Sequence, residues 1–127
     1  MFEQDWIMRQ IREISKMIAH VMLNAEVQST VAELPQEERD LADDLINKMK
    51  SGKVQEAVNE VNSLADSNTR SNLMIGLEFY TSLSDMDEDF LEAGGYSLVK
   101  ARRDFKIFAE KFGMKQMTDL YFGNSDE

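Results

Sequence analysis

Isoleucine recurs at helical spacing near the start of the chain, and this row constrains the fold more than any other feature. It runs from Ile7 to Ile18 in steps of four and three residues, and Val21 and Met22 extend it. At about 100° per residue, these side chains lie within roughly 100° of arc, the width of a helical stripe that faces a core. The pattern predicts a long amphipathic helix that begins at Asp5 and packs against the rest of the chain.

A second apolar row follows, and it does not continue the first. Val27, Val31 and Leu34 would point about 180° away from the isoleucines if the helix were unbroken. Either the helix continues and contacts two different partners, or it breaks near residues 23–25. We predict the break, followed by a short helix or loop as far as Leu34. Pro35 then disfavours a helical conformation before it and is expected to be the first residue of a new helix.

The middle of the chain has the pattern of three helices. Residues 36–65 carry two apolar stripes separated by Gly52, which predicts a tight antiparallel hairpin with Gly52 as a left-handed cap. Residues 72–83 are apolar on almost every side, which predicts a central, buried helix. Gly76 lowers the helix propensity of this segment, so we expect a neighbouring helix to approach it closely.

The last third of the chain predicts one short helix and one long one. Residues 84–92 are acidic and are expected to form the short helix, capped by Ser84 or Asp85. Residues 96–112 are expected to form the long helix, with an apolar stripe on one face and basic residues off it. One further docked turn is expected from Met117, Leu120, Tyr121 and Phe122.

Composition favours the same fold class. The 127 residues include one proline and six glycines, and most of the others are good helix formers. We predict an all-α fold of five or six helices, arranged as a compact bundle or as stacked helical hairpins. Residues 1–122 are expected to form a single domain, and residues 123–127 a frayed tail.

Charge and cysteine content restrict the function classes. The chain contains no cysteine, which excludes disulfides and thiolate metal sites. Its net charge of −10 repels phosphate backbones, which argues against binding of nucleic acid or an anionic membrane. The N-terminus has neither a positively charged region nor an uninterrupted apolar run. We therefore expect no signal peptide, no membrane span and a cytoplasmic location.

No group of residues predicts catalysis, a metal or a cofactor. The acidic run at residues 85–89 resembles the start of a calcium-binding loop, but Phe90 and Tyr96 occupy the positions that require glycine and a bidentate glutamate. His20, the one histidine, falls on the polar face of the first helix, where we expect it to be exposed. We predict that the protein is not an enzyme. A small-ligand binder or enzyme that uses carboxylates between helices is the alternative.

The one basic cluster lies on the long C-terminal helix and consists of Lys100, Arg102, Arg103 and Lys106. We expect it to form ion pairs with the acidic residues 85–92. The alternative is a binding patch for an acidic peptide, a phosphate group or nucleic acid, with Arg102 and Arg103 as its contacts. The phenylalanines of this helix face the core instead of interleaving with the charges, which weakens the nucleic-acid alternative.

Two stretches resemble known families. Residues 52–57, GKVQEA, resemble the helix–helix junction of a tetratricopeptide repeat, and residues 94–99 repeat its spacing with valine in the alanine place. Neither copy has the tryptophan-leucine-glycine signature of that repeat. Residues 5–11, DWIMRQI, resemble the start of a family of small uncharacterised helical bacterial proteins, a domain of unknown function. This second resemblance implies a bacterial cytoplasmic protein and implies no activity.

Taken together, these features predict a protein- or peptide-interaction module, or a protein that associates with itself. Its nine methionines fit either a well-filled core or an adaptable binding surface. Trp6 and Met8 project away from the centre of the isoleucine row, beside Arg9, and these three residues are the first candidates for partner binding. Arg102 and Arg103 are the second. In one form of self-association, two copies would share the isoleucine row.

Overall fold

The structure is a computed structural model that describes residues 2–24 and 33–122, and within these ranges it contains helices and no strand. The elements are α1 (Phe2–Ile18), the π-helical turn η1 (Ala19–Leu23), α3 (Gln36–Lys50), α4 (Val54–Leu64), α5 (Arg70–Ser84), α6 (Glu88–Ala93), α7 (Leu98–Lys111) and α8 (Lys115–Phe122). The all-α prediction is confirmed. The predicted count of five or six is too low, since the described residues form seven α-helices and the expected C-terminal turn is the full helix α8.

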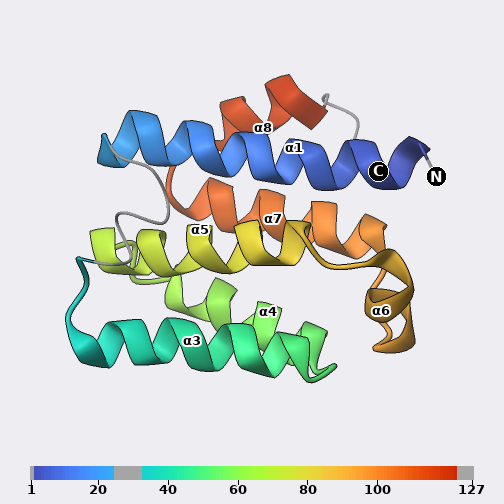
Figure 1. Ribbon diagram of the computed structural model, residues 1–127. Coiled ribbons are helices and arrows are strands. Elements are labelled where there is room, and N and C mark those ends of the chain that lie inside the picture. The colour runs from blue at the N-terminus through green and yellow to red at the C-terminus, as the bar shows by residue number, and fades with distance from the viewer. Residues whose placement is uncertain (1, 25–32, 123–127) are drawn as a thin grey trace.

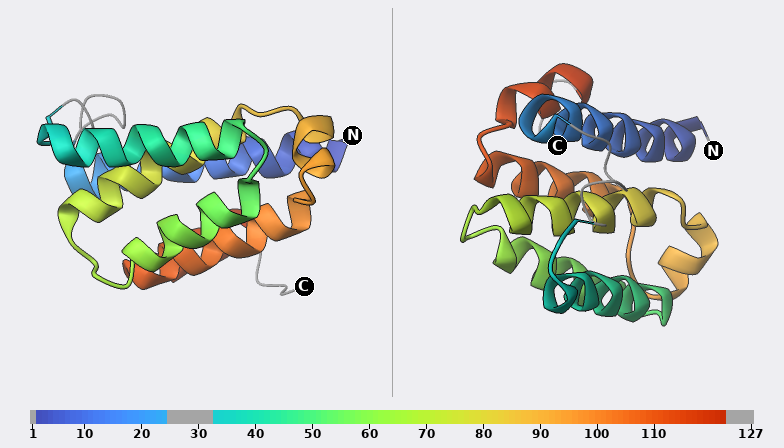
Figure 2. Two further views of the ribbon diagram at one scale, coloured as in Figure 1. Left: turned by 90° about the horizontal axis from the view of Figure 1, so that it is seen from below. Right: turned by 60° about the vertical axis from the view of Figure 1, so that its left-hand side comes forward.

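The helices lie in three layers (Figure 1). α1 and α8 form one outer layer, α5 and α7 the middle one, and α3 and α4 the other outer layer. α6 lies at one end, and the right-hand view of Figure 2 shows the same order of layers. α5 contacts α1 on one side and α3 and α4 on the other. Its predicted central, buried position is therefore confirmed, with seven large apolar side chains in the core: Leu73, Met74, Ile75, Leu77, Phe79, Tyr80 and Leu83.

α1 buries its isoleucine row inside this one chain. Ile11, Ile14 and Ile18 have no exposed surface, because α1 packs against α5, α7 and α8. The row is thus not available to a second copy, which corrects the form of self-association that shares it. The helix begins at Phe2 and not at Asp5. Acidic residues are favourable both at an N-cap and in the turn after it, which explains the difference.

The predicted break after the first helix is confirmed at Asn24, which has a left-handed backbone with φ of 56°. Val21 and Met22, expected in the core, are exposed, and Leu23 is buried in their place. The reason is η1: a π-helical turn holds more residues than an α-helical one, so each residue rotates less about the axis. The short helix or loop expected before Leu34 falls mostly on residues 25–32, which lie outside the described residues.

α3 and α4 form the predicted antiparallel hairpin (Figure 1). Pro35 is the N-cap of α3 and not its first residue, and Gly52 has the predicted left-handed conformation with φ of 104°. Most of the two predicted stripes is buried. Leu41 is an exception at 36% exposure, because it lies at the edge of the α3 stripe and lines an open space between α3 and α4.

The expected close approach to Gly76 of α5 is made by a side chain, the Phe108 ring of α7, and not by the backbone of a neighbouring helix. A Cβ atom built on Gly76 would overlap the ring of Phe108. That ring is fully buried and lies 5.2 Å, centroid to centroid, from the ring of Tyr80 and 5.2 Å from that of Phe112. The missing side chain therefore lets α5 and α7 pack with an aromatic ring between their backbones.

Three features of the C-terminal part differ from the prediction. Ser84 is the last residue of α5, and α6 follows Asp87 as its N-cap. α7 begins after Ser97, whose hydroxyl oxygen accepts a hydrogen bond from the backbone N–H of Lys100 at 3.1 Å. In α8, Leu120 is exposed and not docked, because Thr118 lies on the buried side of the helix. Residues 123–127, the expected tail, lie outside the described residues.

Candidate functional site

The candidate residues of α1 lie in different environments. Trp6 is 38% exposed, and its ring meets the edge of the Phe122 ring of α8 at a centroid distance of 6.0 Å. Arg9 is exposed. Met8 is only 6% exposed, so its expected place on an outer recognition surface is wrong. α1 contacts three helices, and its buried face is therefore wider than the isoleucine row alone.

The two groups of candidates from opposite ends of the chain meet at Phe122. The guanidinium carbon of Arg102 lies 5.6 Å from the centroid of the Phe122 ring, which Trp6 also contacts. Sequence reasoning missed Phe122 as a member of the site, because only the packing of α1, α7 and α8 brings these residues together. Arg103 does not join this cluster: its guanidinium lies 3.0 Å from a carboxylate oxygen of Asp104.

The ion pairs of the basic cluster differ from the predicted ones. Arg103 pairs with Asp104, and Lys106 lies 3.9 Å from Asp119, so neither is paired with the acidic residues 85–92. Within that segment, Asp85 pairs instead with Arg12 of α1 at 3.0 Å. The antiparallel packing of α1 on α5 places Arg12 at the end of α5, so Asp85 pairs with Arg12 and not with the basic cluster of α7.

A buried polar centre lies between α4, α5 and α7. Asp104 is almost fully buried, and its carboxylate accepts hydrogen bonds from the Tyr96 hydroxyl at 2.9 Å, from Gln55 Nε2 at 3.3 Å and from Arg103 Nε at 3.0 Å. The side-chain amide of Asn62 donates to the Asp104 backbone oxygen at 3.1 Å. A buried carboxylate that accepts this many hydrogen bonds ties the surrounding helices together in one arrangement.

The two tyrosines of this centre act as hydrogen-bond donors. Tyr80 donates its hydroxyl proton to Asn62 Oδ1 at 2.9 Å, while Tyr96 donates to Asp104. Burial raises the pKa of both phenols far above the ordinary value, and the negative charge of Asp104 adds to the rise. Both hydroxyls therefore keep their protons. None of these side chains lines either of the hollows below, so the centre supports the fold and contacts no ligand space.

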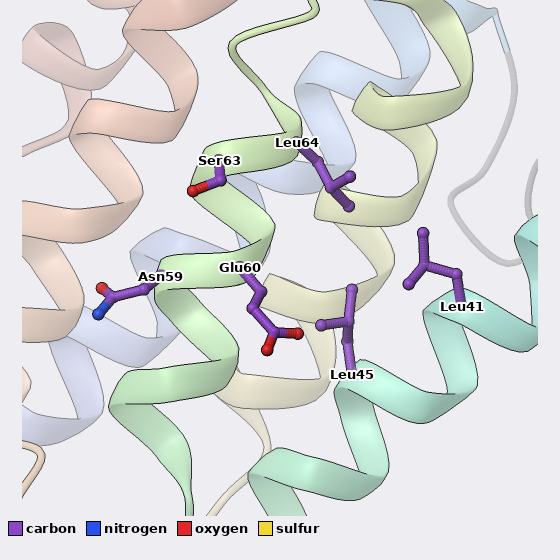
Figure 3. A pocket seen from close by; sticks show the side chains of 6 residues that line it. All are labelled: Leu41, Leu45, Asn59, Glu60, Ser63 and Leu64. Atoms are coloured by element: carbon purple, nitrogen blue, oxygen red, sulfur yellow. The ribbon is translucent and has the colours of Figure 1, made fainter.

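A groove of about 350 Å³ lies between α3 and α4. Its wall consists of three leucines and three polar residues: Leu41, Leu45, Asn59, Glu60, Ser63 and Leu64. Figure 3 shows the three leucine side chains pointing into the space between the helices, with Glu60 extending toward α3. The groove thus offers an apolar floor with a carboxylate at one side, on the outer layer of the molecule.

One carboxylate lines this groove, and others lie close to it along α3 and α4. Glu60 Oε2 accepts a hydrogen bond from Lys48 Nζ at 2.6 Å, and Glu56 lies 3.9 Å from the same nitrogen. The hydrogen bond to Glu60 raises the pKa of Lys48 against the opposing effect of desolvation, so this lysine stays charged. Glu37 and Asp44 are exposed on the Leu41 side of α3, at helical spacings of four and three residues from Leu41. Acidic groups therefore outnumber the one base at the rim.

A further carboxylate lies between α3 and α5. Desolvation of the half-buried Glu78 side chain raises its pKa, and the charge of Asp43 adds to the rise. The ionised form is thus disfavoured in the folded state. Ionisation of Glu78 therefore lowers the free energy of unfolding as the pH rises through the raised pKa. We expect Glu78→Gln to increase the free energy of unfolding at pH 7 by less than about 1 kcal/mol, since solvent screens the half-exposed group.

The measurement is thermal unfolding of both proteins at pH 7 and below the ordinary glutamate pKa of 4.5. The gain from Glu78→Gln should disappear at the lower pH, where Glu78 is protonated in the wild type. Glu110→Gln, at an exposed position of α7, is the matched control and should have no effect at either pH. An equal gain at both pH values would contradict the electrostatic origin.

A second hollow, of about 430 Å³, lies where the end of α1 meets α8. No charged residue lines it, and its wall is rich in methionine: Met17, Gly113, Met114, Gln116, Met117, Leu120 and Tyr121. Leu120 is 80% exposed beside it. Met17 is exposed as well, and so is Val21, four residues further along. Methionine side chains adapt to apolar groups of different shape, so this surface suits an apolar contact.

The described residues provide little for metal chemistry. Residues 2–24 and 33–122 contain no group of three or more histidine, aspartate or glutamate side chains that is placed to hold a metal ion. His20 is exposed in η1, as predicted. Within the same ranges, no helix is both long and apolar enough to span a membrane.

Comparison with known proteins gives one result. No curated protein and no solved structure matches the chain. The resemblance to a tetratricopeptide junction therefore stays a prediction. One family model does match, and it covers residues 1–113, which include α1 to α7. Its description is "Family of unknown function", DUF6483, and the predicted membership of a helical family of unknown function is confirmed. The chain belongs to the family DUF6483.

Proposed function

We propose that this protein is a non-enzymatic binding module, and that its α3–α4 groove holds an amphipathic helix with basic side chains along both edges. One observation carries the proposal: an apolar groove on an outer layer has the carboxylate of Glu60 in its wall, and exposed carboxylates lie within one helical turn of its Leu41. The apolar part would bind the partner's hydrophobic stripe, and the carboxylates would select its flanking charges.

The shape of the groove supports a helix as the ligand. Leu41 and Leu45 come from α3 and Leu64 from α4, so the floor runs between two antiparallel helices. A third helix packs into such a floor with side chains at positions i, i+3, i+4 and i+7. The volume of about 350 Å³ is at the lower end for a binding pocket and suits a few large aliphatic side chains.

The charges support a basic ligand. Lys48 is hydrogen-bonded to Glu60 and close to Glu56, whereas Glu37 and Asp44 are exposed within one helical turn of Leu41. The whole chain carries a net charge of −10, which attracts a basic partner before contact and increases its association rate. An acidic partner would meet repulsion from these carboxylates.

The geometry supports binding over catalysis. Acid–base catalysis on a ligand needs titratable groups that converge on it. The groove wall has one carboxylate, Glu60, and that group is bonded to Lys48. Nucleic-acid binding through the basic helix has less support, because Arg103 and Lys106 pair with carboxylates of this same chain. A bacterial, cytoplasmic location remains the prediction from the sequence.

The test uses a synthetic peptide that carries the features the groove would recognise. The probe is a labelled helix with leucines at i, i+3, i+4 and i+7 and lysines on both sides of this stripe. A second peptide replaces every lysine by glutamate. Fluorescence anisotropy should show binding of the basic peptide, at least tenfold weaker binding of the acidic one, and weaker binding as salt is added.

Two variants connect the binding to the groove. Leu41→Arg introduces a base into the groove and should weaken binding of the basic peptide at least tenfold. Ile107→Arg makes the same change at a residue of α7 with similar exposure, 40% against 36%, and should leave binding unchanged. Equal affinity for the two peptides, or no effect of Leu41→Arg, would overturn the proposal.

A further inference from the structure

We infer that the surface around the α1–α8 hollow joins two copies of this chain in a two-fold symmetric dimer. Met17 near the end of α1 and Val21 of η1 form one part of this surface. The other part comes from Met114, just before α8, and from Met117, Leu120 and Tyr121 of α8. This surface lies in the outer layer opposite the α3–α4 groove (Figure 1). The inference therefore does not depend on the proposed peptide binding.

The surface is complementary to itself. Leu120 projects from α8 with 80% of its surface exposed, directly beside an apolar hollow of about 430 Å³. A two-fold axis brings the same patch of two molecules together, so each copy contributes both a projecting side chain and a hollow to the contact. The Leu120 side chain of each copy would enter the methionine-lined hollow of the other, and the contact closes at two subunits.

The charge of the surface favours a second copy as the partner over a basic protein. The chain as a whole has a net charge of −10, so two copies repel each other in most orientations. In α1 and in α8, however, acidic and basic residues are equal in number, and no charged side chain lines the hollow. An acidic protein can approach here without bringing an excess of carboxylates together. A strongly basic partner would gain nothing from this surface.

The adaptable wall supports burial of a large side chain. Met17, Met114 and Met117 line the hollow, and unbranched methionine chains can close around an inserted leucine. Gly113 lies in the same wall, and a Cβ atom built on it would meet no other atom within 4 Å. The hollow is thus open at that point.

The first test is sedimentation of the full chain across micromolar concentrations, with Leu120→Glu as the variant and Val99→Glu as its control. Both positions are exposed apolar residues, at 80% and 68%, and both variants gain one negative charge. The wild type and Val99→Glu should dimerise alike, and Leu120→Glu should dimerise at least tenfold more weakly. Circular dichroism verifies that all three remain helical.

A second test uses the absence of cysteine from the chain. Met17→Cys protein is mixed with Leu120→Cys protein under oxidising conditions, and the two variants are distinguished by a mass tag. The disulfide between the two different variants should form faster than either symmetric one, because residue 120 of one copy meets residue 17 of the other.

Three results would overturn the dimer. They are a wild type that stays monomeric across the micromolar range, unchanged dimerisation of Leu120→Glu, and an open series of oligomers instead of a closed pair. The lysine-flanked peptide should still bind to monomeric Leu120→Glu. If the wild type dimerises but neither protein binds the peptide, the proposed function alone is contradicted. If the peptide binds but the wild type does not dimerise, the dimer alone is contradicted.

Discussion

Gly76→Ala is expected to lower the free energy of unfolding by about 2 kcal/mol or more, although alanine has the higher helix propensity by about 1 kcal/mol. The added methyl group would overlap the ring of Phe108. That ring cannot move freely, because it is fully buried and packed against Tyr80 and Phe112. The clash therefore outweighs the gain in propensity. Chemical denaturation followed by circular dichroism measures the difference.

The double variant Gly76→Ala/Phe108→Leu separates the clash from other effects. Phe108→Leu alone removes buried aromatic contacts and destabilises the protein. In the Gly76→Ala background, the smaller side chain also relieves the overlap, so the double variant should be more stable than the sum of the two single effects predicts. If Gly76→Ala were as stable as the wild type, the close contact between α5 and α7 would not limit the fold.

Asp104→Ala is expected to destabilise the protein by about 3 kcal/mol, since it removes the acceptor at the centre of a buried hydrogen-bond network. The Tyr96 hydroxyl, which donates to Asp104 at 2.9 Å, is left without that partner, as is Gln55 Nε2. Tyr96 is 1% exposed, so water does not readily replace the carboxylate. The measurement is again the free energy of unfolding from denaturation at neutral pH.

Two further variants test the physical reason for this loss. Tyr96→Phe removes the donor, so Asp104→Ala should cost less in the Tyr96→Phe background than in the wild type. Arg103 has an exposed side chain, and Arg103→Ala should cost less than about 1 kcal/mol. A cost of Asp104→Ala that is equal in both backgrounds would show that the hydrogen bond between Tyr96 and Asp104 contributes little.

The helices were predictable from the sequence because their signals are local. The stripes of α3, α4 and α7 repeat at helical spacing, and Gly52 marks the turn between two of them. The position of Gly76 was informative too. Glycine lowers helix propensity, so a glycine inside an otherwise good helix indicates close packing at that point. In each case, neighbours within one or two turns carried the information.

The remaining features depend on residues that are distant in sequence. Met8 is buried because α1 has neighbours on several sides, and Asp104 is buried because Tyr96 and Gln55 supply donors from other elements. The change of rotation at η1 has no distinct residue pattern, so Val21 was misplaced. Leu120 was misplaced because a short helix with apolar residues on several sides does not show which side docks.

The candidate site was only partly visible for the same reason. Trp6 and Arg102 were chosen separately, and their common contact with Phe122 required the packing of three helices. The α3–α4 groove was missed because Leu41 was assigned to the core stripe. One signal was present: Leu41 lies at the edge of that stripe, with Glu37 and Asp44 beside it.

α1 packs mainly against α5, α7 and α8, which are all synthesised after it. During translation, the α3–α4 hairpin can form as soon as its own residues have left the ribosome, because its contacts are local. The isoleucine row of α1 has no such local partner: residues 70–84 must be made before α5 can cover part of it, and residues 98–122 before α7 and α8 complete the cover. We expect the nascent chain to expose the apolar face of its first helix for much of its synthesis. It should therefore be a substrate for chaperones that bind near the ribosomal exit.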